Sequence, residues 1–405
     1  MLKRTMLAKA LPRVTYVARS FLDYRVPVFK ALNLMLENRL HVLYSTRWTP
    51  ERVQQKISAA LESHAIGLSG ERSLGVNMPE VANQSICIPF QPGLLRAIAK
   101  LEPDILIGDG FFHWTYVGLI YRLWRKVPLV VCYERTFHTE RNAQWYRIAY
   151  RRLAIKLVDA ICCNGQMSVE YTRWLGMPSS RITVGHMVAD TESLSHHASV
   201  IDPDKREAIR LQLGCRGLVF LFVGRLIDSK GVRELLDSWV RFENINPGVG
   251  TLVIVGTGPE ESSLRSQAEK LRLQAVRFVG SVDYDDIASY YAAADVFVIP
   301  TLEDNWSLVV PEAMACGLPI LCSKYNGCWP ELVQEHNGWV FDPLDVKDIL
   351  HSLNLCITHK SNLKQMGQRS RAIINQHTPK QAAQSIYDAC MIAAQHQNAK
   401  KRFKI

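Results

Sequence analysis

Short apolar runs rich in β-branched residues alternate with longer amphipathic segments along almost the whole chain. This alternation is typical of parallel sheets covered by crossover helices. In the first half it predicts helices that include Val26–Leu36 and Leu94–Leu101. It also predicts strands at Arg13–Val17, Leu40–Tyr44, Ser85–Pro89, Asp104–Ile107, Pro128–Cys132, Ala160–Cys163 and Arg181–Val184.

The second half repeats the pattern more clearly. Strands are predicted at Leu218–Val223, Thr251–Val255, Val276–Val279, Val296–Ile299 and Pro319–Cys322. The helices between them are predicted at Gly231–Phe242, Glu260–Leu271, Asp285–Ala293 and Ser307–Ala315. Two consecutive doubly wound α/β units follow from this order. Ligands of such sheets bind beyond the carboxyl ends of the strands, so we expect a site where two such edges face each other.

A polar segment, Thr191–Asp204, separates the two halves, and we predict that it is a linker. We place an N-terminal domain at residues 1–195 and a C-terminal domain at 205–378. The remaining stretch, 379–405, carries a helical pattern long enough to return toward the first domain.

Composition supports a folded protein with more than one core. The chain has 405 residues, of which 48% are hydrophobic and 21% charged, which fits two globular domains and argues against disorder. No apolar run reaches the roughly 20 residues of a membrane span, and Met1–Ala10 lacks the apolar region of a signal peptide. The ten cysteines show no CxxC pair, so we predict neither a zinc site nor a disulfide framework and expect a cytoplasmic location.

The net charge of +10 bears on partners. Basic and aromatic residues gather in Ala143–Leu157, which is predicted to form a helix with one apolar and one basic face. Such a helix suits an anionic membrane surface on the inner side of the membrane, and an ordinary surface helix is an equal alternative. Zinc-finger spacing and aromatic RNA-binding signatures are missing from the sequence, so nucleic acid is not an expected partner.

Two cations stand where a strand gives way to a helix. A predicted strand ends at Gly224, Arg225 follows, and Lys230 immediately precedes the next helix. A guanidinium and an ammonium group neutralise adjacent phosphoryl oxygens, and they stabilise a departing diphosphate as its charge grows. A solvated basic turn is the alternative interpretation.

Two acids frame a later helix start. Asp304 lies in a polar loop after a buried strand, and Glu312 lies within the next helix, which Ser307 is predicted to cap. Backbone amides at a helix start bind anions. Acids beside bound phosphates repel them unless each acid bonds a hydroxyl or a cation, which points to a sugar on each side of a diphosphate. Alternatively, Asp304 belongs to an ordinary polar loop and Glu312 is a surface residue of its helix.

These motifs resemble those of glycosyltransferase family 4, whose members are retaining enzymes with the GT-B fold. Arg225 and Lys230 are similar to the family's diphosphate-binding pair, and Asp304–Glu312 is similar to its E-x7-E motif, continued by Ala313–Pro319. Further family-like segments are Leu252–Gly258, Arg277–Gly280, Tyr290–Pro300, Asn326–Cys328 and, more loosely in the first half, Tyr24–Phe29 and Asn164–Gly176.

The resemblance implies an α/β GT-B architecture, with two Rossmann-like domains facing across a cleft. It implies a nucleotide diphosphate sugar as donor, with no metal and no further cofactor. The acceptor would be a saccharide or a lipid-linked saccharide, in polysaccharide or glycolipid assembly. By resemblance, Glu312 would bind the ribose and Asp304 the sugar hydroxyls. The other implied donor contacts are Gly224, Arg277, Phe278 and Val279 near the nucleotide, and the backbone of Ser307, Leu308 and Val309 near the diphosphate or sugar.

The chain departs from the family pattern in several places. Asp304 replaces the usual Glu, and Asn305-Trp306-Ser307 replaces Gly-Phe-Gly, which alters the expected sugar pocket. Arg19–Asp23 stands in place of a glycine-rich loop, and His186–Asp190 in place of Pro-Asn-Gly-Val-Asp. For the family's catalytic-site histidine we select His138. The alternatives in that part of the chain are Glu134 and His113.

Other functions stay open at this level. A GT-B sugar-nucleotide epimerase would need no acceptor, and a non-catalytic sugar-nucleotide-binding protein would show no turnover. A basic scaffold would bind anionic vesicles or DNA without a donor. A dehydrogenase is not expected, because Val255–Pro259 lacks the third glycine of a dinucleotide fingerprint.

Overall fold

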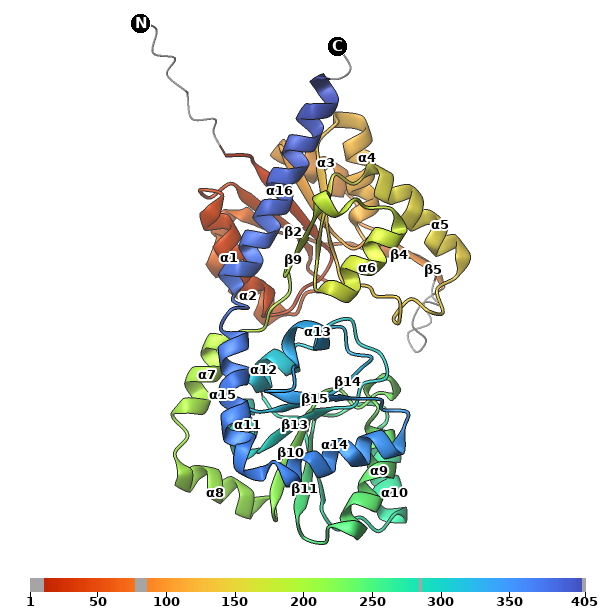
Figure 1. The fold of residues 1–405 in the computed structure, drawn as a ribbon. Helices are drawn as coiled ribbons and strands as arrows, with labels where there is room; N and C mark the ends of the chain where they lie inside the picture. Colours follow the sequence, from red (N-terminus) through yellow and green to blue (C-terminus); the bar gives the residue numbers. More distant parts are fainter. Residues whose placement is uncertain (1–10, 77–85, 284–285, 403–405) are drawn as a thin grey trace, which may run out of the picture.

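The computed structural model describes residues 11–76, 86–283 and 286–402. It contains two parallel-sheet α/β domains, which lie one above the other in Figure 1. The N-terminal stretch Met1–Ala10, Ser85 at a predicted strand start and Asp285 at a predicted helix start lie outside the described residues.

The first domain is built on a seven-stranded sheet of order β3-β2-β1-β6-β7-β8-β9, with every neighbouring pair parallel. Its strands are β1 Val14–Ala18, β2 Leu40–Ser45, β3 Ala65–Leu68, β6 Ile105–Asp109, β7 Leu129–Tyr133, β8 Ala160–Cys163 and β9 Ile182–Val184. Its helices are α1 Arg25–Met35, α2 Glu51–Leu61, α3 Leu94–Leu101, α4 Thr115–Arg125, α5 Trp145–Ala154 and α6 Gln166–Leu175. Apolar clusters cover both faces of the sheet, as parallel sheets require.

One predicted strand does not belong to the large parallel sheet. The segment predicted at Ser85–Pro89 forms β5 (Ile86–Phe90), which pairs antiparallel with β4 (Arg72–Val76) in a separate two-stranded sheet. The prediction also missed β3 and β4. These strands are short, and β3 is only half-buried, so neither shows the apolar run that marks a central strand.

The second domain has a six-stranded parallel sheet of order β12-β11-β10-β13-β14-β15. Its strands are β10 Leu218–Val223, β11 Gly250–Val255, β12 Val276–Gly280, β13 Val296–Ile299, β14 Ile320–Ser323 and β15 Gly338–Phe341. Its helices are α9 Val232–Ile245, α10 Glu261–Lys270, α11 Ile287–Ala293, α12 Val309–Ala315, α13 Trp329–Leu332, α14 Val346–Thr358 and α15 Leu363–Ile374. The strand order reverses between β10 and β13, and ligands of open parallel sheets bind at such a switch point.

The linker predicted at Thr191–Asp204 is wrong. The segment forms helix α7 (Thr191–Ser199), and α8 (Pro203–Gln212) begins before the predicted end of the linker. Asp190 accepts a 3.3 Å hydrogen bond from the amide of Ser193 and so caps α7. Leu194 packs into the core of the second domain, and α7 lies against α11 and α12. The polar composition hid this helix, because few apolar residues suffice to dock it.

Helix α16 (Pro379–Arg402) runs back along the first domain, where it packs against α1 and β8 (Figure 1). Its inward stripe is fully buried and consists mainly of small side chains, at Ala382, Ala383, Ile386, Ala389, Cys390 and Ala393. Small residues allow close helix packing, so the end of the chain ties the first domain to the last helices of the second. Among the helices of the described residues, none has both the length and the apolar character needed to cross a bilayer.

Candidate functional site

The carboxyl ends of the central strands of the second domain bring glycine backbone together. The amide of Gly224 donates to the carbonyl of Val255 (3.0 Å), and the amide of Gly256 donates to the carbonyl of Gly280 (2.8 Å). A Cβ atom at Gly256 would lie 1.9 Å from the carbonyl oxygen of Gly224, so only glycine allows this approach. The ends of β10 and β11 therefore lie backbone against backbone.

Hydrogen bonds connect the loop after β10 to the loop after β13. The carbonyl of Ser229, in the turn after β10, accepts hydrogen bonds from the Thr301 hydroxyl and the Leu302 amide, both at 2.8 Å. A Cβ atom at Gly231 would lie 2.0 Å from the carbonyl oxygen of Pro300. The two segments predicted to hold the cations and the first acid thus meet at the switch point.

Lys230 and Asp304 form an ion pair at this junction. The Ser307 hydroxyl donates to the same carboxylate, and the Trp306 amide donates to its other oxygen at 3.0 Å. The prediction that Ser307 caps the next helix is wrong, because α12 begins at Val309 and the hydroxyl is bonded to Asp304 instead. Asp304 is thereby held in one orientation by three donors.

Positive groups that remain available lie around this pair. Arg225 is exposed, and its guanidinium has no ion pair or hydrogen bond to any other described residue. The amides of Leu308 and Val309, at the start of α12, have no hydrogen-bond acceptor within the described part of the chain. Together with Lys230 they can receive an anion at the end of β10 and β13.

Glu312 lies within α12, separate from the Lys230 pair. The Tyr291 hydroxyl donates to its Oε2 atom at 2.9 Å. Burial raises the pKa of Glu312 to about 7; the hydrogen bond from Tyr291 opposes this shift, and the negative charge of Asp190 adds to it. This carboxyl group therefore changes protonation near neutral pH.

The segment Arg277–Val279 lies in the edge strand β12. The Arg277 guanidinium donates to the carbonyl oxygens of Leu213 (2.9 Å) and Gly214 (3.2 Å), which precede β10. It is thus directed to the amino edge of the sheet, opposite to Arg225, and its side chain does not border the predicted nucleotide site. The Phe278 ring lies 4.8 Å from the guanidinium carbon of Arg265 on α10, and the Val279 side chain packs against the core of the domain.

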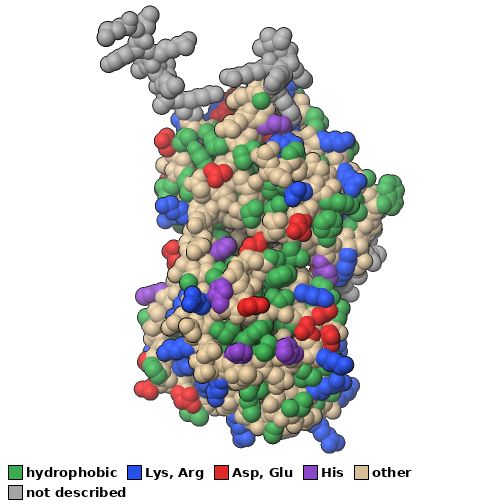
Figure 2. Space-filling view, viewed as in Figure 1, with side chains coloured by type: hydrophobic (Ala, Val, Ile, Leu, Met, Phe, Trp, Pro, Cys, Tyr) green, Lys and Arg blue, Asp and Glu red, His purple; other side chains and the backbone are tan. Residues whose placement is uncertain are grey.

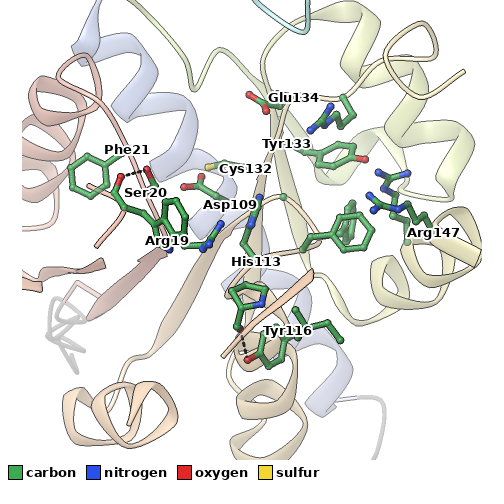
Figure 3. A pocket seen from close by; sticks show the side chains of 18 of the residues that line it. Arg19, Ser20, Phe21, Asp109, His113, Tyr116, Cys132, Tyr133, Glu134 and Arg147 are labelled. Carbon is green, nitrogen blue, oxygen red and sulfur yellow. Dashed lines mark hydrogen bonds between the residues drawn. The ribbon is translucent and has the colours of Figure 1, made fainter. Parts of the chain in front are cut away.

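A cavity of about 930 Å³ opens in the first domain, at the carboxyl ends of β1, β6 and β7 (Figure 3). The sheet order reverses between β1 and β6, so this cavity lies at the switch point of its own sheet. Its lining is rich in aromatic and basic side chains, among them Arg19, Trp48, Phe112, Tyr116, Arg135, Tyr146, Arg147 and Tyr150. Aromatic faces and guanidinium groups suit a saccharide that stacks and accepts hydrogen bonds.

A buried polar cluster forms the floor of the cavity. Asp109 accepts hydrogen bonds from the Tyr16 hydroxyl (2.5 Å) and from Arg25 (3.1 Å). Arg25 also donates to Nδ1 of His186 at 3.3 Å, which leaves Nε2–H to donate to the carbonyl of Tyr133. Burial, followed by the charge of Arg25, places the pKa of His186 well below its ordinary value, consistent with a neutral ring. Sequence reasoning missed this cluster, although Asp109 ends an apolar strand.

The loop that replaces the glycine-rich turn is tied to a buried acid. Arg19 donates to Glu71 at 2.9 Å, and the indoles of Trp48 and Trp114 donate to the same carboxylate at 2.6 and 2.9 Å. Glu71 carries no local sequence signal, because it lies just before the short strand β4. These contacts set one wall of the cavity.

His138 lies at the contact between the domains. Its Nε2–H donates to the carbonyl of Leu302 at 2.8 Å, and its ring stacks on Tyr325 with centroids 4.2 Å apart. Nearby, Arg141 pairs with Glu303 at 2.8 Å. The ring of His138 is thus engaged by the second domain. The alternative residues His113 and Glu134 both line the cavity instead.

Family models match both halves of the chain. One described as Glycosyl transferases group 1 matches residues 206–373, and one described as Glycosyltransferase Family 4 matches residues 36–193. The chain belongs to glycosyltransferase family 4. The resemblance predicted from Arg225, Lys230 and the Asp304–Glu312 motif is confirmed.

Two curated proteins show the range of similar family 4 sequences. A glycogen synthase of Mycobacterium tuberculosis is 35% identical over 187 residues, covering 46% of this chain and 42% of that protein. Sulfoquinovosyl transferase SQD2 of Arabidopsis thaliana is 30% identical over 304 residues, covering 71% of this chain and 56% of that protein. The chain spans about half the length of these relatives.

Solved structures share the fold of this family 4 chain along nearly all of its length. The Anabaena protein HepE in complex with UDP has a TM-score of 0.71 at 19% identity, and the match covers 93% of this chain and 98% of that one. The complex of the same Anabaena protein with UDP-glucose has a TM-score of 0.69. The predicted GT-B fold, with two α/β domains, is confirmed.

The departures from the family 4 motif fall at the contact between domains. Trp306 is buried, and a Cβ atom at Gly165 of the first domain would lie 2.6 Å from its ring. The amide of Gln166, beside Gly165, donates to Glu331 of the second domain. A Cβ atom at Gly327 would lie 1.9 Å from the carbonyl oxygen of Asn305, so this loop requires its glycine. The altered residues thus pack the two domains together around the Lys230 pair.

Proposed function

We propose that the protein transfers a sugar from a nucleotide diphosphate sugar to an acceptor bound in the cavity of the first domain. The observation that carries this proposal is the meeting of Lys230 with Asp304 and Ser307 at the switch point of the second sheet. Family membership and the likeness to structures titled as UDP and UDP-glucose complexes support it.

The diphosphate would bind against Arg225, Lys230 and the amides of Leu308 and Val309. Lys230 would then exchange its partner, from the carboxylate of Asp304 to a phosphoryl oxygen. That exchange leaves Asp304 free to accept hydrogen bonds from the hydroxyls of the donor sugar. The positive groups stabilise the nucleotide diphosphate as it leaves, so we propose that the reaction needs no divalent metal and no further cofactor.

The nucleoside would lie on the backbone surface at the ends of β10, β11 and β12. Glu312 would accept hydrogen bonds from the ribose hydroxyls, while Val279 and Gly280 would border the base through their backbone. Gly224 and Gly256 support this placement, because they bring no side chain to these strand ends. Retention of anomeric configuration is part of the proposal and rests on family membership.

We propose a saccharide or lipid-linked saccharide as the acceptor. Helix α5 lends Tyr146, Arg147 and Tyr150 to the cavity wall and exposes Trp145 and Leu153. In Figure 2, apolar and basic side chains gather along the edge of the upper domain where α5 lies. A lipid carrier could rest on an anionic membrane at this edge while its sugar enters the cavity, with the protein on the cytoplasmic face.

The basic face of α5 differs from the predicted one. Arg151 is buried and pairs with Glu140 at 2.6 Å, and Arg147 lines the cavity. Within the predicted helix Ala143–Leu157, the exposed basic residues are Arg152 and Lys156. The guanidinium of Arg152 lies 4.3 Å from the ring of Trp174. Any attraction to an anionic surface therefore depends on these two.

A panel of nucleotide sugars tests the proposal. Thermal stabilisation by UDP-, GDP-, ADP- or dTDP-linked sugars, unchanged by EDTA, together with slow release of the nucleotide diphosphate, is the expected result. Stabilisation without any release, even with added saccharide acceptors, would instead indicate a binding protein. Release that requires a divalent cation would contradict the metal-independent part alone.

A further inference from the structure

Glu134 stands at the end of a central strand, between the cavity and the second domain. It follows β7 directly, is half-buried and lines the cavity (Figure 3). Its carboxylate makes no hydrogen bond or ion pair with any other residue in the described ranges. By contrast, Asp109 in the same cavity is held by Tyr16 and Arg25. A half-buried carboxylate without a partner is costly, so it needs a functional reason.

Charged groups of both domains act on this carboxylate. These charged groups are the side chains of Arg135, Arg25, Asp109 and Asp304, and the phenol of Tyr24 also interacts with Glu134. Burial raises the pKa of Glu134 above its ordinary value, the two arginines oppose that shift, and the two aspartates add to it. The influence of Asp304 is informative, because that residue belongs to the second domain. Glu134 therefore lines the acceptor cavity within electrostatic range of the acid assigned to the donor sugar.

One of the two histidines considered for this region, His138, is engaged by the second domain. Nε2 of His138 is bonded to the carbonyl of Leu302, and its ring is covered by Tyr325. A side chain that acts on a reacting sugar must present a free polar atom to it. Glu134 presents a carboxylate without a partner among the described residues, whereas the ring of His138 is fixed to the second domain through Nε2 and its stack on Tyr325.

We propose that the carboxylate of Glu134, and not the imidazole of His138, contacts the transferring sugar and stabilises positive charge at its anomeric carbon. This inference rests on the proposed transferase function. During transfer the bond from the anomeric carbon to the diphosphate oxygen breaks, and its electron pair leaves with the nucleotide diphosphate. The acceptor hydroxyl forms the new bond to that carbon, and its proton passes to the departing diphosphate. Glu134 remains ionised and faces the oxocarbenium-like centre.

The test compares wild type with Glu134→Gln, which keeps the shape of the side chain and removes its charge. Release of the nucleotide diphosphate is measured for the UDP-, GDP-, ADP- and dTDP-linked glucoses, and the best donor is used thereafter. We expect kcat at saturating donor to fall on the order of 10²-fold. The donor Kd should change by less than about threefold, because the charge acts mainly in the transition state.

Stability and pH separate this role from a structural one. Because the folded protein raises the pKa of Glu134, ionising the group costs folding free energy as pH rises above the ordinary glutamate value. Glu134→Gln should therefore leave the thermal midpoint unchanged or raise it while turnover falls. The acid limb of kcat in the wild type should also vanish in this variant. A structural role predicts loss of stability instead.

The matched control is Glu170→Gln, the same change at an exposed position of α6. It should leave kcat and the thermal midpoint at wild-type values. Turnover of Glu134→Gln within about threefold of wild type, with the acid limb retained, would overturn the inference and leave the transferase intact. If wild type releases no nucleotide from any donor, the proposed function itself fails.

Discussion

The two candidate binding regions of this molecule differ in the state of one acid each. In the second domain the acid assigned to the donor sugar is satisfied within the protein, since Lys230, Ser307 and the Trp306 amide all bond to Asp304. In the first domain, the cavity contains an acid, Glu134, that has no partner among the described residues. Asp304 must give up an internal contact before it can bind a ligand, whereas Glu134 can bind a ligand without losing one.

This difference follows from how far apart the contributing segments lie in each sheet. The second region consists of the loops after β10 and β13, which are neighbouring strands. The first region gathers residues from the loops after β1 and β2, from β4 to β7, from α1, α4 and α5, and from the segment before α7. A two-loop site can be encoded by two compact motifs, which is why these could be found in the sequence. A cavity built from many segments can vary its lining and so can fit different acceptors.

The largest expected effect comes from the cations of the second region. Lys230→Ala or Arg225→Ala should lower kcat by about 10²–10³-fold, because each removes charge from the leaving diphosphate. Steady-state release of nucleotide diphosphate measures this. Lys270→Ala, an exposed lysine of α10, is the control and should behave as wild type. Normal turnover in both site variants would remove the diphosphate from this region.

Loss of Glu312 should act on affinity. Glu312→Gln keeps the Tyr291 contact but weakens acceptance from ribose hydroxyls, so the nucleotide-sugar Kd should rise by about tenfold. Isothermal calorimetry provides the measurement. In the wild type the affinity should fall as pH drops below about 7, where Glu312 takes up a proton. An unaltered Kd in the variant would exclude Glu312 from the ribose site.

Glu312 also predicts a dependence of stability on pH. Its pKa is raised from 4.5 to about 7, so between these values the folded protein holds a proton that the unfolded chain has lost. Folding stability should therefore fall as pH rises through this window, and Glu312→Gln should flatten that slope. Chemical denaturation at several pH values tests both proteins, and identical slopes would contradict the assigned shift.

A smaller effect is expected at the contact between the two regions. His138→Ala removes the hydrogen bond to Leu302 and the stack on Tyr325, which hold the domains together around the site. We expect kcat to fall by less than about tenfold with the donor Kd nearly unchanged, because no group that binds the donor is lost. His351→Ala, exposed on α14, is the control. A fall in kcat as large as that of Lys230→Ala would instead indicate that His138 acts on the reacting sugar.

The smallest effect on catalysis belongs to the membrane contact. Reversing the charge of Arg152 and Lys156 should weaken binding to anionic liposomes in a flotation assay, by at least roughly thirtyfold if each contributes about 1 kcal/mol, with little change in donor turnover. Reversal at Lys364 and Arg369, exposed on α15 in the other domain, changes the net charge equally and should not reduce flotation. Equal flotation of all three proteins would end the membrane proposal.

Local patterns in the sequence were sufficient for most of the framework. Buried strands appear as apolar runs, and the polar residue after each run must lie at the carboxyl edge of a parallel sheet. Arg225, Lys230 and Asp304 could therefore be placed at one edge before any coordinates. Helix α7 was missed because its docking depends on few apolar residues, and β4 was missed because it is a short strand without an apolar run.

Pairing between distant segments could not be predicted in the same way. Lys230 and Asp304 are 74 positions apart, His138 and Leu302 164 positions apart, and each pair forms only after strand order and domain contact are set. The same holds for the burial of Arg151 against Glu140 and for the turn of Arg277 toward the amino edge. Which side chain lies at the end of a strand can be read from nearby residues, because it depends on the local apolar pattern. The hydrogen-bond partner of that side chain depends on the whole chain. Only the fold could therefore show that Nε2 of His138 is bonded to Leu302 and that Glu134 has no partner among the described residues.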